Sequence, residues 1–129
     1  MQSGMLSKFE ANYFECFSLA LDRIIQYKDR LNIPDFNSVM SIRIFNVLGK
    51  SITQLRYAKG LSFKDKKEYL VNLKKQRLIQ DYYGYYYSIS NQLERPYYKM
   101  LINCLNKGKY LIIILALYIK NLMDWDKKH

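Results

Sequence analysis

The 129-residue sequence contains only five glycines and two prolines, so few positions are suited to tight turns and long helices are favoured. Its only histidine is the last residue, His129. We therefore expect no histidine general base, no Ser/His/Asp triad and no Cys/His nucleophile, because a chain end is seldom held in place. The glycines are scattered singly, which excludes a Gly-rich phosphate loop. We expect no catalytic residue and no cofactor of the chain's own.

Cysteine is also scarce. Cys16 and Cys104 lie far apart, with too few Cys and His residues around them to form a zinc site. Their apolar neighbours predict free, buried thiols in a reducing compartment rather than a disulfide. Asp124 and Asp126 match the Asp-x-Asp pair that holds a divalent cation in many sugar-nucleotide enzymes. Because the pair follows a helix and precedes a basic chain end, we expect a solvated charged tail over residues 124–129 and no metal.

The sequence lacks the basic and apolar regions of a signal peptide, since residues 1–7 form a short polar lead-in. This predicts a cytoplasmic location. The longest apolar run is the ten residues 110–119, whereas a bilayer span needs roughly twenty. Residues 110–123 are nevertheless apolar on nearly every side of a helix, which requires either other helices around it or a membrane interface. We expect the first, with this helix as the most buried element.

Apolar residues recur at three- and four-residue steps along four further segments, and predict helices over residues 7–31, 36–58, 63–77 and 91–106. Pro34 should end the first of these helices, and Asp35 should cap the second. Ser62 and Asp65 resemble a capping box for the third, while Pro96 fits either the first turn of the fourth or a kink.

Residues 79–90 contain five tyrosines around Gly84, and we interpret this segment as a packed loop. The expected fold is all-α: a compact bundle of four to five helices around the apolar C-terminal helix. We expect the 129 residues to form one helical domain.

The charge balance is strongly positive, with 21 Lys and Arg against 11 Asp and Glu and a net charge of +10. Such a balance favours an acidic partner, whether nucleic acid, anionic lipid or a phosphorylated metabolite. The candidate site for an anion or a membrane surface is a run of seven cations: Lys59, Lys64, Lys66, Lys67, Lys74, Lys75 and Arg77. On one helix these cannot all share a face, so some of them should be plain solvated surface.

The order of features resembles the helical C-terminal region of bacterial family 2 glycosyltransferases, which build capsular and other cell-surface polysaccharides. Residues 2–7 look like the end of the loop that closes the catalytic domain, and residues 9–31 like the helix after it. Residues 61–75 resemble the basic linker helix of such enzymes, and residues 97–123 their Leu/Ile/Tyr/Lys tail. The catalytic domain's metal-binding Asp-x-Asp, nucleotide-binding strands and catalytic base have no counterpart here.

The resemblance therefore implies a non-catalytic appendage that packs on a glycosyltransferase domain or docks at the inner face of the membrane. A second interpretation is a small basic four-helix bundle that binds nucleic acid, like those accompanying retroelements and ribosomal intervening sequences. A third is a purely structural interaction module, which would form stable oligomers and bind no ligand.

Overall fold

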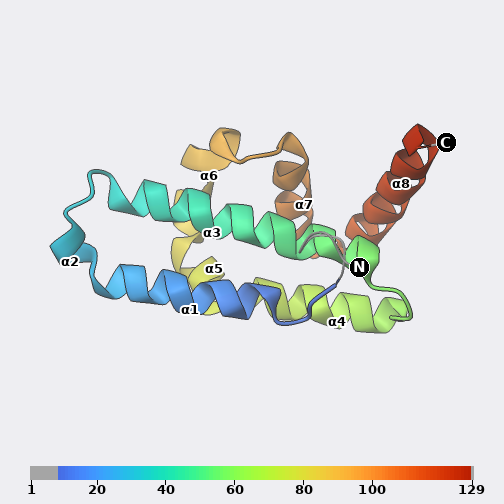
Figure 1. The fold of residues 1–129 in the computed structure, drawn as a ribbon, viewed down its shortest axis with the longest axis horizontal. Helices are drawn as coiled ribbons and strands as arrows, with labels where there is room; N and C mark the ends of the chain where they lie inside the picture. Colours follow the sequence, from blue (N-terminus) through green and yellow to red (C-terminus); the bar gives the residue numbers. More distant parts are fainter. Residues whose placement is uncertain (1–8, 129) are drawn as a thin grey trace.

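The computed structural model describes residues 9–128, with the backbone alone from residue 124. No strand occurs in this part of the chain, which confirms the all-α prediction. The helices, shown in Figure 1, are α1 (Tyr13–Gln26), α2 (Lys28–Leu31), α3 (Phe36–Thr53), α4 (Phe63–Lys74), α5 (Arg77–Tyr82), α6 (Tyr86–Ile89), α7 (Pro96–Asn106) and α8 (Tyr110–Lys128). Short 3-10 turns, η2 (Gln54–Tyr57), η3 (Tyr83–Tyr85) and η4 (Ser90–Gln92), connect several of them.

Helix α3 is the centre of the molecule. It contacts α1, α5, α6 and α7, and Figure 1 shows it running along the length of the fold. Most of its buried residues are large and apolar, and three of them are small: Ser41, Gly49 and Ser51. Ser41 and Ser51 are buried, but each hydroxyl donates to a backbone carbonyl one turn earlier, at 2.6 and 2.8 Å. The buried residues of α3 are Phe36, Met40, Ser41, Ile44, Phe45, Leu48, Gly49, Ser51 and Ile52.

Gly49 brings α3 and α7 into close contact. A β-carbon at this position would overlap the ring of Tyr98, which is itself buried. The absence of a side chain at Gly49 is therefore a packing requirement.

Helix α8 is not the core of the bundle, and the prediction that residues 110–123 are the most buried element is wrong. Only Ile113 and Leu117 of this segment are buried. The helix lies on η2, α4 and α7 with one side, and its other side faces solvent. An apolar helix is buried on all sides only if other elements surround it. In this fold α3 is the helix that other elements surround, and α8 packs at the edge of the fold.

The interpretation of residues 79–90 as a loop is also wrong, because the segment forms α5, η3, α6 and η4. Tyr86 is fully buried, with its ring 5.0 Å from the ring of Phe45 in an edge contact. Ile79 and Ile89 are buried as well. Contact with α3 therefore orders these short helical turns, although aromatic residues alone favour extended structure.

The predicted helix boundaries are partly correct. The backbone N–H of Asp65 donates to Ser62 Oγ at 3.1 Å, which confirms the Ser62 cap. Asp35 occupies the N-cap of α3, but its side chain makes no capping hydrogen bond. Pro96 lies in the first turn of α7 and does not kink it.

The first predicted helix, residues 7–31, is divided at Tyr27 into α1 and α2. Both cysteines are free, but Cys16 is exposed and Cys104 is half-buried, so the prediction of buried thiols is wrong. The lead-in at residues 1–7 and the side chains of the charged tail at residues 124–129 lie outside the described part. The backbone of α8 runs on to Lys128.

Candidate functional site

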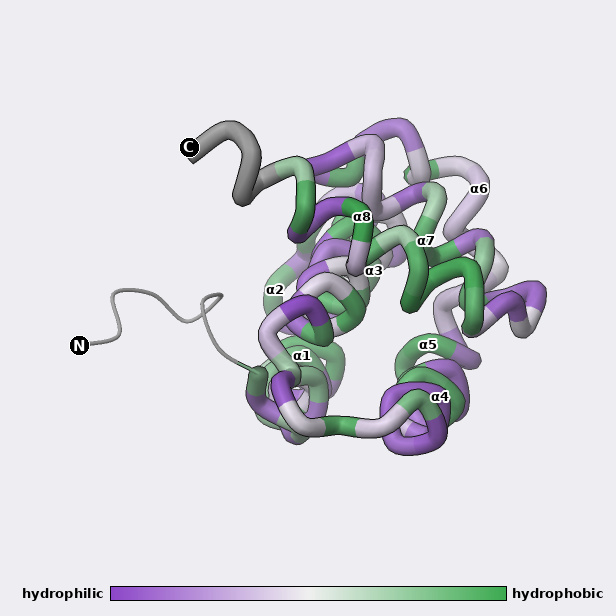
Figure 2. Tube along the Cα trace, turned by 90° about the vertical axis from the view of Figure 1, so that its right-hand side faces the viewer, coloured by the Kyte–Doolittle hydropathy of each residue, from purple (hydrophilic) through white to green (hydrophobic). Residues whose placement is uncertain are grey.

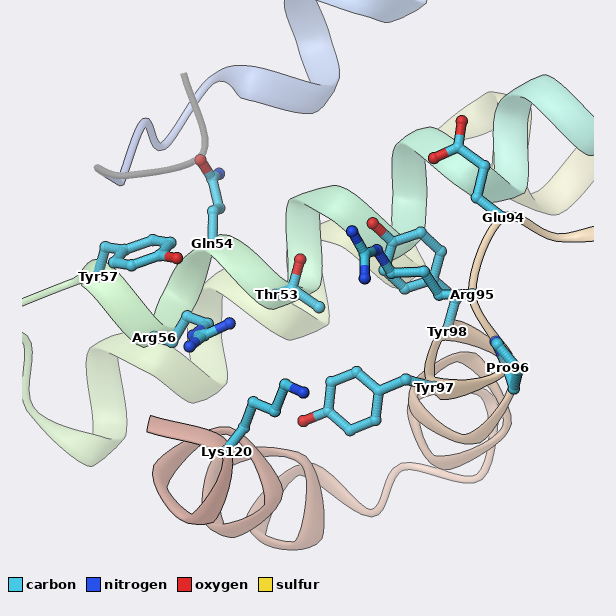
Figure 3. A pocket seen from close by; sticks show the side chains of 10 residues that line it. All are labelled: Thr53, Gln54, Arg56, Tyr57, Glu94, Arg95, Pro96, Tyr97, Tyr98 and Lys120. Carbon is cyan, nitrogen blue, oxygen red and sulfur yellow. The ribbon is translucent and has the colours of Figure 1, made fainter. Parts of the chain in front are cut away.

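Two features of the fold could bind a partner: a cationic cavity and an apolar surface on α8. The cavity has a volume of about 610 Å³ and lies where η2, the start of α7 and α8 meet (Figure 3). Its lining includes three cationic side chains and three aromatic ones: Arg56, Arg95, Lys120, Tyr57, Tyr97 and Tyr98.

A reciprocal pair of hydrogen bonds joins two of the elements that line the cavity. Arg56 Nε donates to Asn121 Oδ1 at 2.8 Å, and Asn121 Nδ2 donates back to the carbonyl oxygen of Arg56 at 2.9 Å. These bonds join η2 to α8 and fix the plane of the Arg56 guanidinium. The neighbouring Lys120 extends toward Tyr97, with Nζ 5.8 Å from the ring centroid (Figure 3). Such a distance allows a cation–π attraction.

Glu94 is the only carboxylate among the described residues that line the cavity. Its side chain is turned away from Arg56 and Lys120 (Figure 3). Its Oε2 lies 3.4 Å from Lys50 Nζ. Burial raises the pKa of the Tyr98 hydroxyl, although the adjacent Arg95 guanidinium acts in the opposite direction. Tyr98 is therefore a neutral phenol near pH 7, and the formal charges of the described lining residues sum to a positive value.

The seven predicted cations do not gather at one site. Lys64, Lys67 and Lys75 are exposed and border one shallow hollow on α4, a helix with many hydrophilic residues in Figure 2. Lys59 is exposed in the turn before α4, and Lys74 is half-buried near α7. The prediction that they cannot share one face is confirmed, while their binding role stays a prediction.

Two of the seven have other neighbours. Lys66 is half-buried and borders a hollow of about 370 Å³ between α4 and α8, opposite Ile114 and Tyr118. Arg77 forms an exposed ion pair with Asp22 of α1 at 2.7 Å, and the hydrogen bond and charge of Asp22 raise the pKa of its guanidinium. The ion pair of Arg77 therefore links α5 to α1.

The second feature is the solvent side of α8, here called the α8 stripe. Its seven side chains are each between 46% and 57% exposed: Leu111, Ile112, Leu115, Tyr118, Ile119, Leu122 and Met123. At 100° per residue they cover an arc of roughly 140°. Sequence reasoning missed this surface because the apolar residues of this segment do not identify which side faces the bundle.

The cavity cations were missed for another reason. Arg56, Arg95 and Lys120 come from three segments that are distant in the sequence, so no local pattern connects them. Only the contact of η2, α7 and α8 brings them together.

The described residues contain no group of three or more His, Cys, Asp and Glu side chains that could hold a metal ion. Within the same range, no helix has the length and apolar character required to cross a membrane. The side chains of Asp124, Asp126 and His129 are not described.

Comparison of the chain with models of known protein families, with curated proteins and with solved structures gives no match. The resemblance to the C-terminal region of family 2 glycosyltransferases therefore has no support from these comparisons and stays a hypothesis.

Proposed function

We propose that this protein is a docking module whose α8 stripe lies in the interface of an anionic membrane. The observation that carries the proposal is the stripe itself, a continuous row of half-exposed apolar side chains on an otherwise packed helix. These seven large apolar side chains are each about half exposed and together form one apolar patch. The largest apolar patch of a typical monomer is about 300–600 Å² and is often functional.

The surroundings of the stripe favour lipid as the occupant. Lys107 and Lys109 are exposed in the turn between α7 and α8, and Lys66 borders the hollow beside Tyr118. A lysine near an anionic bilayer contributes about 1 kcal/mol of attraction at physiological salt. Tyrosine is favoured at such an interface, because its ring is apolar and its hydroxyl can reach water. The net charge of +10 acts in the same direction.

The biological setting that we propose comes from the sequence resemblance. A glycosyltransferase that builds cell-surface polysaccharide works beside a membrane, and an appendage with an apolar stripe would keep its catalytic domain there. The anionic cytoplasmic leaflet is the surface that suits the positive charge. In this role the chain performs no chemistry.

The test is co-sedimentation of the full chain with vesicles of phosphatidylglycerol and phosphatidylcholine. We expect binding that weakens when phosphatidylglycerol is omitted. The double variant Leu115→Ser/Ile119→Ser should lose most of it, because both side chains leave the stripe. The matched control is Leu19→Ser on α1, a residue that is 71% exposed and lies on another helix. It should bind vesicles like the unmodified chain.

Two other occupants are outcomes of the same experiment. If the chain does not sediment with vesicles but forms dimers that Leu115→Ser/Ile119→Ser disrupts, the stripe binds a second copy. If a gel shift instead shows salt-sensitive binding of structured RNA or DNA, and Lys64→Gln/Lys67→Gln/Lys75→Gln abolishes it, the nucleic-acid interpretation holds. Either result would overturn the membrane proposal.

A further inference from the structure

We propose that the hollow between α4 and α8 binds one acyl chain that carries an anionic head group. The hollow has a volume of about 370 Å³ and shares only Leu115 and Tyr118 with the α8 stripe. Docking by the stripe requires a membrane surface, whereas the hollow holds a single chain. The ligand class follows from the walls of the hollow, the charge of its lining and its size.

Apolar and aromatic side chains form most of the walls. Leu55 of η2 and Leu117 of α8 are buried, and Ile114 of α8 is half-buried. Arg56 and Asn121 also line the hollow, and the reciprocal hydrogen bonds between them occupy the amide of Asn121. The walls therefore suit a ligand that is apolar along its length.

Lys66 determines which head group is complementary. No carboxylate is found among the described residues that line the hollow. The side chain of Lys66 is half-buried, and its ammonium forms no ion pair with a described residue. Its four-carbon stem can lie against the apolar wall while the ammonium meets a carboxylate or phosphate in water. The hydroxyl of Tyr118, a residue that is 57% exposed, can donate to the same head group.

The size of the hollow suits a single chain. A volume of about 370 Å³ is near the lower end of the range of roughly 300–1,000 Å³ for small-molecule sites. A narrow acyl chain fits such a space better than a bulky ring system or a lipid with two chains. Each methylene group removed from water strengthens binding roughly fourfold. The affinity should therefore rise with chain length until the hollow is full.

The chain could belong to a free fatty acid or to a membrane lipid. Isothermal titration below the critical micelle concentration, with dodecanoate and with lysophosphatidylglycerol carrying the same chain, distinguishes the two sources. Preference for either one supports an acyl-chain site and identifies its ligand. Octanoate should bind at least tenfold more weakly than dodecanoate, because its chain is four carbons shorter. Dodecyltrimethylammonium, with the same chain length and a cationic head group, should also bind at least tenfold more weakly.

Two variants test the walls and the charge. Ile114→Trp should fill the hollow and weaken dodecanoate binding at least tenfold, whereas the control Leu111→Trp, on the exposed side of α8, should change affinity less than twofold. Lys66→Gln should weaken binding at least fivefold, and Lys66→Arg should retain most of the affinity. Its control is Lys64→Gln, which removes the same charge from an exposed position of α4 outside the hollow. Thermal unfolding of each variant establishes that it is folded.

Three results would overturn the proposal. Equal affinity for octanoate and dodecanoate would mean that no chain is buried. Equal losses in Lys66→Gln and Lys64→Gln would assign the attraction to overall charge. A loss in Leu111→Trp as large as that in Ile114→Trp would place the chain on the open surface of α8.

Failure here and failure of membrane docking are distinguishable. Ile119→Ser/Leu122→Ser removes two side chains of the α8 stripe that do not line the hollow. This double variant should reduce sedimentation with vesicles and leave dodecanoate affinity unchanged. Conversely, Ile114→Trp should lose dodecanoate binding and still sediment with anionic vesicles.

Discussion

Helices α3 and α8 show that apolar composition and burial are different properties. Helix α3 includes Asn, Ser, Arg and Lys along its length, yet nine of its residues are buried. Residues 110–119 of α8 contain no charged residue, yet only Ile113 and Leu117 of this run are buried. The difference is the number of neighbours, because α3 is in contact on several sides and α8 on one. The α8 stripe is therefore apolar surface without a cover inside the described chain.

The largest expected effect separates the two helices directly. Ile44→Ala on α3 should lower the free energy of unfolding by about 3–4 kcal/mol, because it leaves a cavity at a fully buried position. Leu115→Ala on the α8 stripe should lower it by less than about 1 kcal/mol, since the side chain is half exposed. Urea unfolding followed by circular dichroism measures both values. Equal losses would mean that the two helices are buried to a similar degree.

A second substitution tests how closely α3 is packed. Gly49→Ala should destabilise the protein by about 1–3 kcal/mol, because the new methyl group meets the ring of Tyr98. Gly84→Ala is the control, since an added β-carbon there has no heavy atom within 4 Å. We expect it to be neutral or slightly stabilising in thermal unfolding. A harmless Gly49→Ala would show that α7 does not approach α3 at this point.

A third prediction concerns the attachment of α8. Asn121→Ala removes the two hydrogen bonds to Arg56 and should lower stability by about 1–2 kcal/mol. Amide hydrogen exchange should become faster in α8, while α3 exchanges as before. Asn72→Ala on the exposed side of α4 is the control and should affect neither helix. Faster exchange throughout the molecule would instead indicate that α8 unfolds together with the core.

The smallest expected effect is a change in how the free energy of unfolding depends on pH, and it concerns Tyr83. Burial raises the pKa of Tyr83 from its ordinary value of 10.0 to about 12, with a smaller contribution from Tyr87. The folded state therefore holds this proton more tightly than the unfolded state. Its contribution to stability is complete below about pH 10 and is lost as the pH rises toward 12. Tyr83→Phe should make alkaline unfolding less steep than in the unmodified chain. The control Tyr87→Phe, at an exposed position, should change it less.

The sequence predicted those parts of the fold that depend on local physics. Helical periodicity located the long helices, and the side chain of Ser62 marked the start of α4. The start of α7 was predicted at residue 91, whereas the helix begins at Pro96. The misplaced elements depend on distant contacts. Tyr86 becomes helical because it packs on Phe45, about forty residues earlier in the chain. The sequence could not show which side of α8 faces solvent, because Leu115 and Leu117 are equally suited to burial.

The candidate site divides in the same way. The seven cations of residues 59–77 lie within one short segment, so the sequence alone could identify them. It could also show that they do not all lie on one face of a helix. The cavity is formed by Arg56, Arg95 and Lys120, and no spacing rule connects residues so far apart. Their proximity follows only after α7 and α8 have been placed against η2.

The central claim is that the α8 stripe is exposed in the free protein and covered by lipid. We would replace Trp125 by Phe and introduce Leu115→Trp, so that the only tryptophan reports on the stripe. The account predicts a solvent-exposed emission maximum in buffer and a blue shift on addition of phosphatidylglycerol vesicles. Emission that is already blue-shifted in dilute buffer, or that stays unchanged with vesicles, would contradict it.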